Sequence, residues 1–312
     1  MKNVIFVVGP TASGKTEYAV RLAEIFNGEI ISADSMQIYR HMDIGSAKPS
    51  KEQLQRVPHH LIGTVDPSEP FSAAEYKKLA EACIEEVFHR QKQPFVCGGT
   101  GLYINALLYD MDFSAAPGDR AKREAILAEI GQGQPEKLHA HLKSLDPEAA
   151  RMIHPNNVKR VLRAIERLEN GTEGTLTSFD RTKCLTKAFS PILIGLERDR
   201  QALYRRIEER VDHLLVQGLE REVAGLLSMG LKEDDIAMKG IGYKELIPWI
   251  RGTGTLEQAV AEIKTHTRRY AKRQMTWFRS LGDIRWFPLE DSDFDEKALE
   301  RMAFYIKERL GA

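Results

Sequence analysis

Eight consecutive residues near the start of the sequence have the types and spacing that bind phosphate groups. They match the pattern G-x-x-x-x-G-K-[ST] and run Gly9-Pro10-Thr11-Ala12-Ser13-Gly14-Lys15-Thr16. In such a loop the glycines let successive backbone N–H groups turn toward an anion, and the lysine neutralises phosphate oxygens. The hydroxyl of the final threonine can bind a Mg²⁺ ion beside the phosphates. The segment therefore predicts a phosphate site with magnesium, whereas a plain glycine-rich turn is the alternative.

A second candidate for chemistry is the carboxylate of Asp34, which lies at the carboxyl end of the predicted strand 29–34. A typical P-loop ATPase has an acidic residue at the end of another apolar strand, where it holds Mg²⁺ and the attacking water. Here the apolar residues 95–97 are followed by Gly98-Gly99-Thr100 instead. A phosphate loop with one free carboxylate suits a base that acts on a nucleophile beside a bound pyrophosphate. An aspartate that only caps a helix or forms a turn is the alternative.

The elements that must position these residues are short strands alternating with helices. Apolar runs predict buried strands at 4–8, 29–34, 95–97 and 192–196, and apolar residues at helical spacing follow Thr16. Short apolar strands separated by helical stretches indicate an α/β fold with a parallel sheet as the P-loop core.

Two regions of the sequence have little strand character. The residues between the third and fourth predicted strands are rich in Ala, Leu and Glu, and they are too many for a loop. We therefore expect a mostly helical insertion domain at 116–189, with the catalytic core formed by 1–115 and 190–312. Beyond Leu196 the sequence predicts helices almost to the end.

The composition is typical of a folded globular protein. The chain has 312 residues with 45 Lys plus Arg, 45 Asp plus Glu and 42% hydrophobic residues, which excludes a disordered or collagen-like chain. Its three cysteines, Cys83, Cys97 and Cys184, lie far apart and predict neither a disulfide framework nor a zinc site. The apolar residues 4–8 are too few for a membrane span, so we expect no membrane partner. A monomer in the cytoplasm is the expectation.

Positive charge is concentrated in two segments despite the neutral total. Residues 264–279 carry six basic side chains and no acidic one, interleaved with Tyr270 and Trp277. A second basic group lies at 151–167. Positive charge beside flat aromatic rings is what an RNA backbone and an unstacked base require, although a solvated basic face is the simpler alternative.

Seven motifs, in order over nearly the whole chain, resemble those of the bacterial tRNA dimethylallyltransferases. They are the segments 9–16, Ser32-Ala33-Asp34-Ser35-Met36-Gln37-Ile38-Tyr39, Asp43-Ile44-Gly45-Ser46-Ala47-Lys48-Pro49, Pro58-His59-His60-Leu61, Gly98-Gly99-Thr100-Gly101-Leu102-Tyr103, Gly240-Ile241-Gly242-Tyr243-Lys244-Glu245 and Lys272-Arg273-Gln274-Met275-Thr276-Trp277-Phe278-Arg279. Departures are small, because Ile38, Ser46 and Asn157 stand where the family commonly has Val, Thr and Asp.

The resemblance implies transfer of a dimethylallyl group from dimethylallyl diphosphate to N6 of the adenosine just 3′ of the tRNA anticodon. The phosphate loop would hold the diphosphate of the donor, with Mg²⁺ as cofactor and Thr16 as its protein ligand. The tRNA anticodon stem-loop would be the macromolecular partner.

The resemblance also implies roles for individual residues. Asp34 would be the general base, with Thr100 and Arg206 as further catalytic residues that bind the diphosphate. The residues implied to contact tRNA are Asp34, Ser35, Met36, Gln37, Thr100, Arg123, Lys159, Arg160, Arg163, Gly242, Tyr243, Arg269, Lys272, Arg273, Gln274, Trp277 and Arg279.

Three other functions stay open from the sequence. An adenylate isopentenyltransferase would use free AMP, ADP or ATP as the acceptor, and a P-loop kinase would phosphorylate a small metabolite. A non-catalytic RNA-binding protein with a vestigial loop is the third. The basic segments disfavour the first, and the intact Lys15, Thr16 and Asp34 disfavour the last.

Overall fold

The computed structural model describes residues 2–109, 111, 125–128, 130, 134–169 and 185–311. The chain divides into two compact units. The sheet unit comprises Met1–Leu108 and Thr186–Ala312, and the helical unit comprises Tyr109–Leu185. The boundaries expected from sequence, 116 and 189, differ from this division by several residues.

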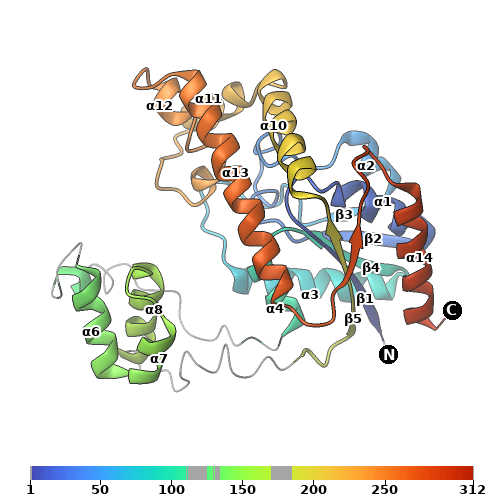
Figure 1. The fold of residues 1–312 in the computed structure, drawn as a ribbon, viewed down its shortest axis with the longest axis horizontal. Helices are drawn as coiled ribbons and strands as arrows, with labels where there is room; N and C mark the ends of the chain where they lie inside the picture. The colour runs from blue at the N-terminus through green and yellow to red at the C-terminus, as the bar shows by residue number, and fades with distance from the viewer. Residues whose placement is uncertain are drawn as a thin grey trace. The chain divides into compact units, whose positions relative to one another are not determined.

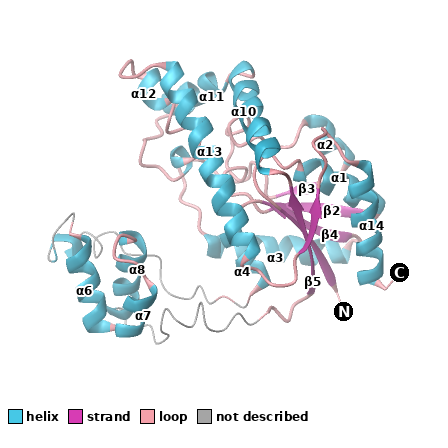
Figure 2. Cartoon of the chain, viewed as in Figure 1, coloured by secondary structure: helices cyan, strands magenta, loops and turns pink. Residues whose placement is uncertain are grey.

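The strands of the sheet unit form a parallel sheet, drawn in magenta in Figure 2. Within the described residues the sheet has six strands in the order β3-β2-β4-β1-β5-β6, and every neighbouring pair is parallel. Their bounds are β1 Asn3–Val8, β2 Gly28–Ser32, β3 His59–His60, β4 Gln93–Gly98, β5 Ser190–Glu197 and β6 Arg285–Pro288. This arrangement confirms the predicted α/β fold with a parallel sheet.

Helices cover the sheet, so that its central strands are buried. Every residue of β1 from Val4 to Val8 is fully buried, as expected for a parallel strand packed on both faces. Ile5 and Val7 join a core cluster with side chains of α1 and α14, which lie against each other (Figure 1). The helices of this unit are α1 Lys15–Ile25, α2 Lys51–Arg56, α3 Ala73–His89, α4 Gly101–Leu108, α10 Arg200–Val216, α11 Leu219–Ser228, α12 Ile247–Ile250, α13 Leu256–Arg279 and α14 Glu296–Leu310, with the 3₁₀ helix η1 Ala237–Lys239.

The helical unit has a hydrophobic core of its own. Its described helices are α6 Pro135–Leu145, α7 Pro147–Met152 and α8 Val158–Glu169. Leu142 of α6 and Val161 and Ile165 of α8 are fully buried in that core. Asp146 caps α7, because its Oδ1 accepts hydrogen bonds from the N–H groups of Glu148 and Ala149.

Two short edge strands were not predicted. The sequence predicted helices almost to the end beyond Leu196, but β6 pairs with β5 at Arg285–Pro288. Only one of its four residues is buried, so the strand has no apolar run to reveal it. The two-residue β3 is equally short. Among the described residues, no helix is long and apolar enough to cross a membrane.

Candidate functional site

Three loops meet at the carboxyl edge of the sheet. The phosphate loop follows β1, Asp34 follows β2, and Thr100 follows β4. Strand β4 lies between β1 and β2, so the ends of these three strands are neighbours. Ligands of parallel α/β sheets bind at this edge, which makes the meeting point the candidate site.

The phosphate loop has the backbone conformation that its sequence predicts. Gly14 has a φ of 92° and caps α1, which begins at Lys15. Such a left-handed cap is cheap only for glycine, because it has no Cβ. The Lys15 ammonium donates to the carbonyl of Pro10 at 3.0 Å, across the loop. Burial lowers the pKa of Lys15, while Asp34 nearby raises it, so the ammonium is poorly solvated and suited to an anionic ligand.

Side chains from distant elements support this loop. Gln274 of α13 accepts from the N–H of Thr11 and donates to the carbonyl of Gly99, both at 2.8 Å. Arg198 donates to the carbonyl of Ser13 at 3.1 Å. These contacts fix the loop relative to α13 and the end of β4.

A cavity opens at the same edge of the sheet, and both basic side chains and the Asp34 carboxylate line it. It has about 610 Å³ of empty space, including its opening to solvent. Lys15, Thr16, Asp34, Arg210 and Tyr270 are among its lining residues. The arrangement can therefore hold a phosphate group on one side and a proton-accepting carboxylate on the other.

Asp34 both forms a turn and lines this cavity. Its Oδ1 accepts from the N–H groups of Met36 and Gln37, at 2.9 and 3.3 Å. No other described residue donates to the carboxylate, so Oδ2 is available to a ligand. The two interpretations of Asp34, as a turn residue and as a base, are thus compatible. Oδ1 forms the turn, and Oδ2 can accept a proton.

Thr100 holds the Asp34 turn in place. Its hydroxyl oxygen accepts from the N–H of Ser35 at 3.0 Å and donates to the Ser35 hydroxyl at 3.3 Å. Its own N–H donates to the carbonyl of Ala33 at 3.1 Å. The sequence predicts that this hydroxyl donates to the diphosphate, but in the structure it bonds to Ser35 and Thr100 is not among the residues that line the cavity.

The predicted cation Arg206 does not line the cavity. Its guanidinium donates to the carbonyls of Ala12 and Ser292, both at 3.3 Å, and pairs with Asp293. Arg210, one helical turn later, lines the cavity instead. Burial lowers the pKa of Arg210, opposed by the charge of Asp34. Both arginines belong to the arginine-rich segment that the sequence indicates, and they lie on the same side of α10, one turn apart along its axis.

Tyr270 is a second cavity residue that sequence reasoning placed elsewhere. Its position among basic residues suggested RNA stacking, but the side chain lines the cavity with Asp34 and Gln274. Burial, together with the charge of Asp34, raises the pKa of its hydroxyl well above the usual value. The group therefore stays protonated and can donate a hydrogen bond.

Several residues implied to contact tRNA are occupied inside the protein. Tyr243 is 1% exposed, Gly242 is buried, and Gln274 is 5% exposed in its bridge to the phosphate loop. The Gln37 amide donates to the carbonyls of Ser46 and Ala47. These side chains serve the shape of the site in this structure rather than an exposed surface.

Other predicted contacts lie on the surface. Arg269, Lys272 and Arg273 are exposed on α13. On the same helix Trp277 is 39% exposed and donates to Asn105, and exposed Arg279 pairs with Glu197 at 2.5 Å. In the helical unit Lys159 and Arg160 are exposed and Arg163 is half-buried, whereas Arg123 lies outside the described residues. Ser35 and Met36 are half-buried beside Asp34.

The fold and the site together define a P-loop α/β enzyme in which the phosphate loop after β1 and a carboxylate after β2 line one cavity. A family model described as IPP transferase matches residues 37–281. The chain therefore belongs to the IPP transferase family.

Its relatives match over nearly the whole chain. The tRNA dimethylallyltransferase of Acetivibrio thermocellus is 46% identical over 306 residues, covering 98% of both chains. The enzyme of that name from Alkaliphilus oremlandii is 48% identical, covering 96% of this chain and 95% of the relative. The solved tRNA isopentenylpyrophosphate transferase of Bacillus halodurans is 40% identical with a TM-score of 0.75. The match covers 100% of this chain and 97% of the solved chain. A eukaryotic dimethylallyltransferase solved while acting on tRNA has a TM-score of 0.83 at 28% identity, covering 99% of this chain and 80% of that one.

Proposed function

We propose that this protein transfers a dimethylallyl group from dimethylallyl diphosphate to N6 of the adenosine 3′ of the tRNA anticodon, releasing diphosphate. The observation that carries the proposal is the single cavity that joins Lys15 and Arg210 to Asp34. The names of the relatives support both the transferred group and the tRNA acceptor. We further propose that it acts in the cytoplasm as a monomer.

Asp34 would act as the general base. The N6 amine is a weak nucleophile, because its lone pair is delocalised into the purine ring. As the bond from N6 to C1 of the donor forms, a carboxylate at hydrogen-bond distance accepts the N6 proton. Oδ2 of Asp34 is the free oxygen for this proton, while Oδ1 stays bonded to the turn.

The phosphate loop would stabilise the leaving group. Breaking the C1–O bond leaves its electron pair on the diphosphate, where negative charge grows. Lys15 and Arg210 line the cavity and can neutralise that charge, and the N-terminus of α1 adds its partial positive charge. The protonated Tyr270 hydroxyl can donate a further hydrogen bond in the same cavity.

The residues present fit a magnesium ion held mainly by the substrate. Thr16 lines the cavity together with Lys15, and its hydroxyl would supply a protein oxygen to the ion. Mg²⁺ in phosphate sites commonly takes one or two protein oxygens, with phosphate oxygens and water completing its shell. The described residues hold no group of three His, Cys, Asp or Glu side chains that would form a protein-only site. When bound, the ion would neutralise diphosphate charge.

The tRNA would bind across exposed basic side chains. Arg269, Lys272 and Arg273 present positive charge on α13, the helix whose Gln274 touches the phosphate loop. Contact with an RNA backbone here would place the acceptor beside the cavity. Lys159, Arg160 and Arg123 of the insertion are proposed to contact the anticodon stem.

One set of incubations tests the proposal against its alternatives. The purified protein is incubated with Mg²⁺ and labelled dimethylallyl diphosphate, with unmodified tRNA or free AMP in separate tubes, and ATP hydrolysis is measured in a control incubation. Label in tRNA alone is the expected result. Label in AMP would assign the adenylate acceptor instead, and no label with ATP turnover would assign a kinase.

A further inference from the structure

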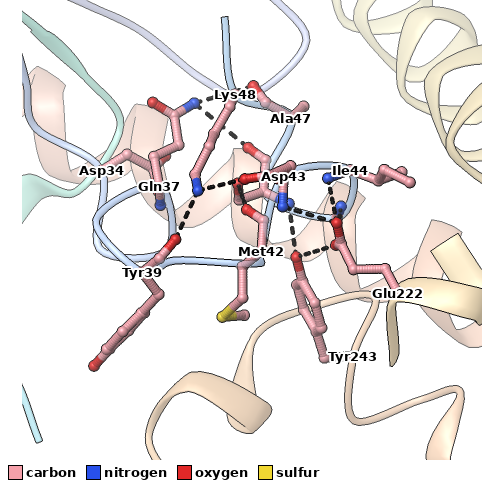
Figure 3. Close-up of polar contacts among 12 residues, drawn as sticks. Asp34, Gln37, Tyr39, Met42, Asp43, Ile44, Ala47, Lys48, Glu222 and Tyr243 are labelled. Carbon is pink, nitrogen blue, oxygen red and sulfur yellow. Dashed lines mark hydrogen bonds and ion pairs between the residues drawn. The ribbon is translucent and has the colours of Figure 1, made fainter. Parts of the chain in front are cut away.

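One carboxylate holds a loop that forms part of the cavity wall. Glu222 of α11 accepts from the N–H groups of Asp43, Ile44 and Gly45, at 2.8, 2.7 and 2.9 Å (Figure 3). Its Oε1 also accepts from the Tyr243 hydroxyl at 2.7 Å. The three backbone donors belong to a segment without strand or helix, so a side chain satisfies donors that secondary structure leaves open.

Tyr243 adds a third segment to these contacts. We call the Glu222 and Tyr243 side chains, with the backbone N–H groups of residues 43–46 that they bind, the clamp. Its hydroxyl oxygen accepts from the N–H of Ser46 at 3.1 Å while its proton goes to Glu222. The ring lies against Gly45, where a Cβ would come within 2.5 Å of the ring. A Cβ on Gly240 would come within 2.8 Å of Met36 Sδ. Thus the motifs at 32–39, 43–49 and 240–245 pack against one another.

The clamped loop is connected to the candidate base. Ser46, Ala47 and Pro49 line the cavity. The Gln37 amide donates to the carbonyls of Ser46 and Ala47, at 3.4 and 3.1 Å, and the Gln37 backbone N–H donates to Asp34. A displacement of the loop would therefore move Gln37 and disturb the turn that orients the Asp34 carboxylate.

The loop has a separate attachment that does not depend on Glu222. The Lys48 ammonium donates to the carbonyl of Tyr39 at 2.7 Å and pairs with the Asp43 carboxylate at 2.6 Å. Figure 3 shows both bonds of Lys48, separate from those of Glu222 and Tyr243. Loss of the Glu222 carboxylate would therefore loosen the span 43–46 without releasing the whole segment.

We propose that Glu222 is a positioning residue for the transfer reaction. It fixes the cavity wall at 46–49 and, through Gln37, the orientation of Asp34. This inference rests on the proposed function, and it assigns the Asp43–Pro49 and Gly240–Glu245 motifs a shared task in the transfer step. None of the hydrogen bonds of the Glu222 carboxylate goes to the phosphate loop. Binding of the donor should therefore not depend on Glu222.

The test is Glu222→Gln in the full chain, which keeps the side-chain shape but replaces one acceptor oxygen with an NH₂ group facing backbone N–H groups. We expect kcat with tRNA to fall about tenfold, the effect of one misplaced charged hydrogen bond, while KM for dimethylallyl diphosphate changes less than about twofold. Glu220→Gln on the same helix is the matched control, since the Glu220 side chain makes no hydrogen bond to a described residue. Rates are expressed per folded molecule, with the folded fraction measured by circular dichroism.

Tyr243→Phe is a second variant, which keeps the ring against Gly45 and removes one donor to Glu222. It should lower kcat about threefold, again with the donor KM unchanged, and it tests the proposal if Glu222→Gln folds poorly. A wild-type kcat in both variants would overturn the inference, as would an equal loss in Glu220→Gln or a parallel rise in donor KM. A wild-type protein that fails to label tRNA would instead overturn the proposed function.

Discussion

Arg206 and Arg210 lie one helical turn apart on α10 but face different surroundings. Arg206 donates to the carbonyl of Ala12 on the outside of the phosphate loop and pairs with Asp293. Arg210 lines the cavity with Lys15 and Asp34. Residues four apart lie on the same side of a helix, so their different roles follow from where each meets the loop.

This difference predicts different kinetic effects of the same substitution. Arg210→Gln removes a poorly solvated cation from the cavity and should raise KM for dimethylallyl diphosphate roughly tenfold or more. Arg206→Gln removes a support outside the cavity and should change it less than about threefold. Steady-state kinetics with varied donor measures both. The reverse order would return the diphosphate contact to Arg206.

Asp34→Ala should keep tRNA and donor binding but lose most of the transfer activity. Removing a general base typically lowers the rate by about 10²- to 10⁴-fold. Asp34→Asn is the sharper variant, because its amide oxygen can still accept from the N–H groups of Met36 and Gln37. Single-turnover transfer at saturating substrate concentrations measures the rate of the chemical step separately from substrate binding. Near-normal turnover in Asp34→Asn would exclude the carboxylate as base.

Lys15→Ala should weaken diphosphate binding. The ammonium is held over the loop by the Pro10 carbonyl, ready to pair with phosphate oxygens. Loss of a charged hydrogen bond predicts an increase of about ten- to a hundredfold in the dissociation constant for inorganic diphosphate with Mg²⁺. Calorimetric titration measures it, with Lys51→Ala on the exposed face of α2 as control. Equal affinities would contradict the phosphate-loop assignment.

Replacing Arg269, Lys272 and Arg273 with glutamine should lower tRNA affinity and its dependence on salt. Each phosphate contact contributes roughly one unit to the slope of log K against log salt concentration, so the slope should become shallower by up to about three. Filter binding at several salt concentrations gives both values. If neither changes, these exposed side chains are only a solvated face of α13.

The lowered pKa of Glu29 should make the free energy of unfolding depend on pH. Burial opposes its charge, but hydrogen bonds from Arg90 and His60 hold its pKa at about 2. Since the folded pKa lies below the ordinary value of 4.5, ionised Glu29 stabilises the fold above pH 4.5, and this contribution is lost as pH falls toward 2. Glu29→Gln should therefore cost about 3 kcal/mol of unfolding free energy at pH 7. In urea unfolding the gap between the two proteins should narrow by pH 3.5, and a constant gap would contradict this account.

Local patterns in the sequence were sufficient to predict the four central strands and the phosphate loop. The apolar runs that became β1, β2, β4 and β5 are continuous because both faces of a parallel strand are buried. The glycines of the loop have a local backbone reason, as the φ of Gly14 shows. The short edge strand β6 lacked such a signal, because only one of its residues is buried.

The tertiary structure decided what the candidate residues touch. Sequence spacing marked Asp34, the arginine-rich part of α10 and the aromatic residues of α13, but the rotation of each helix depends on packing between distant segments. That packing brings Arg210 and Tyr270 into the cavity and buries Tyr243 against Gly45. Residue types and their spacing were therefore enough to indicate which chemical groups are present, namely a phosphate loop, a carboxylate and a group of basic side chains. Only the fold decided which cation faces the carboxylate, because long-range contacts carry no local sequence pattern.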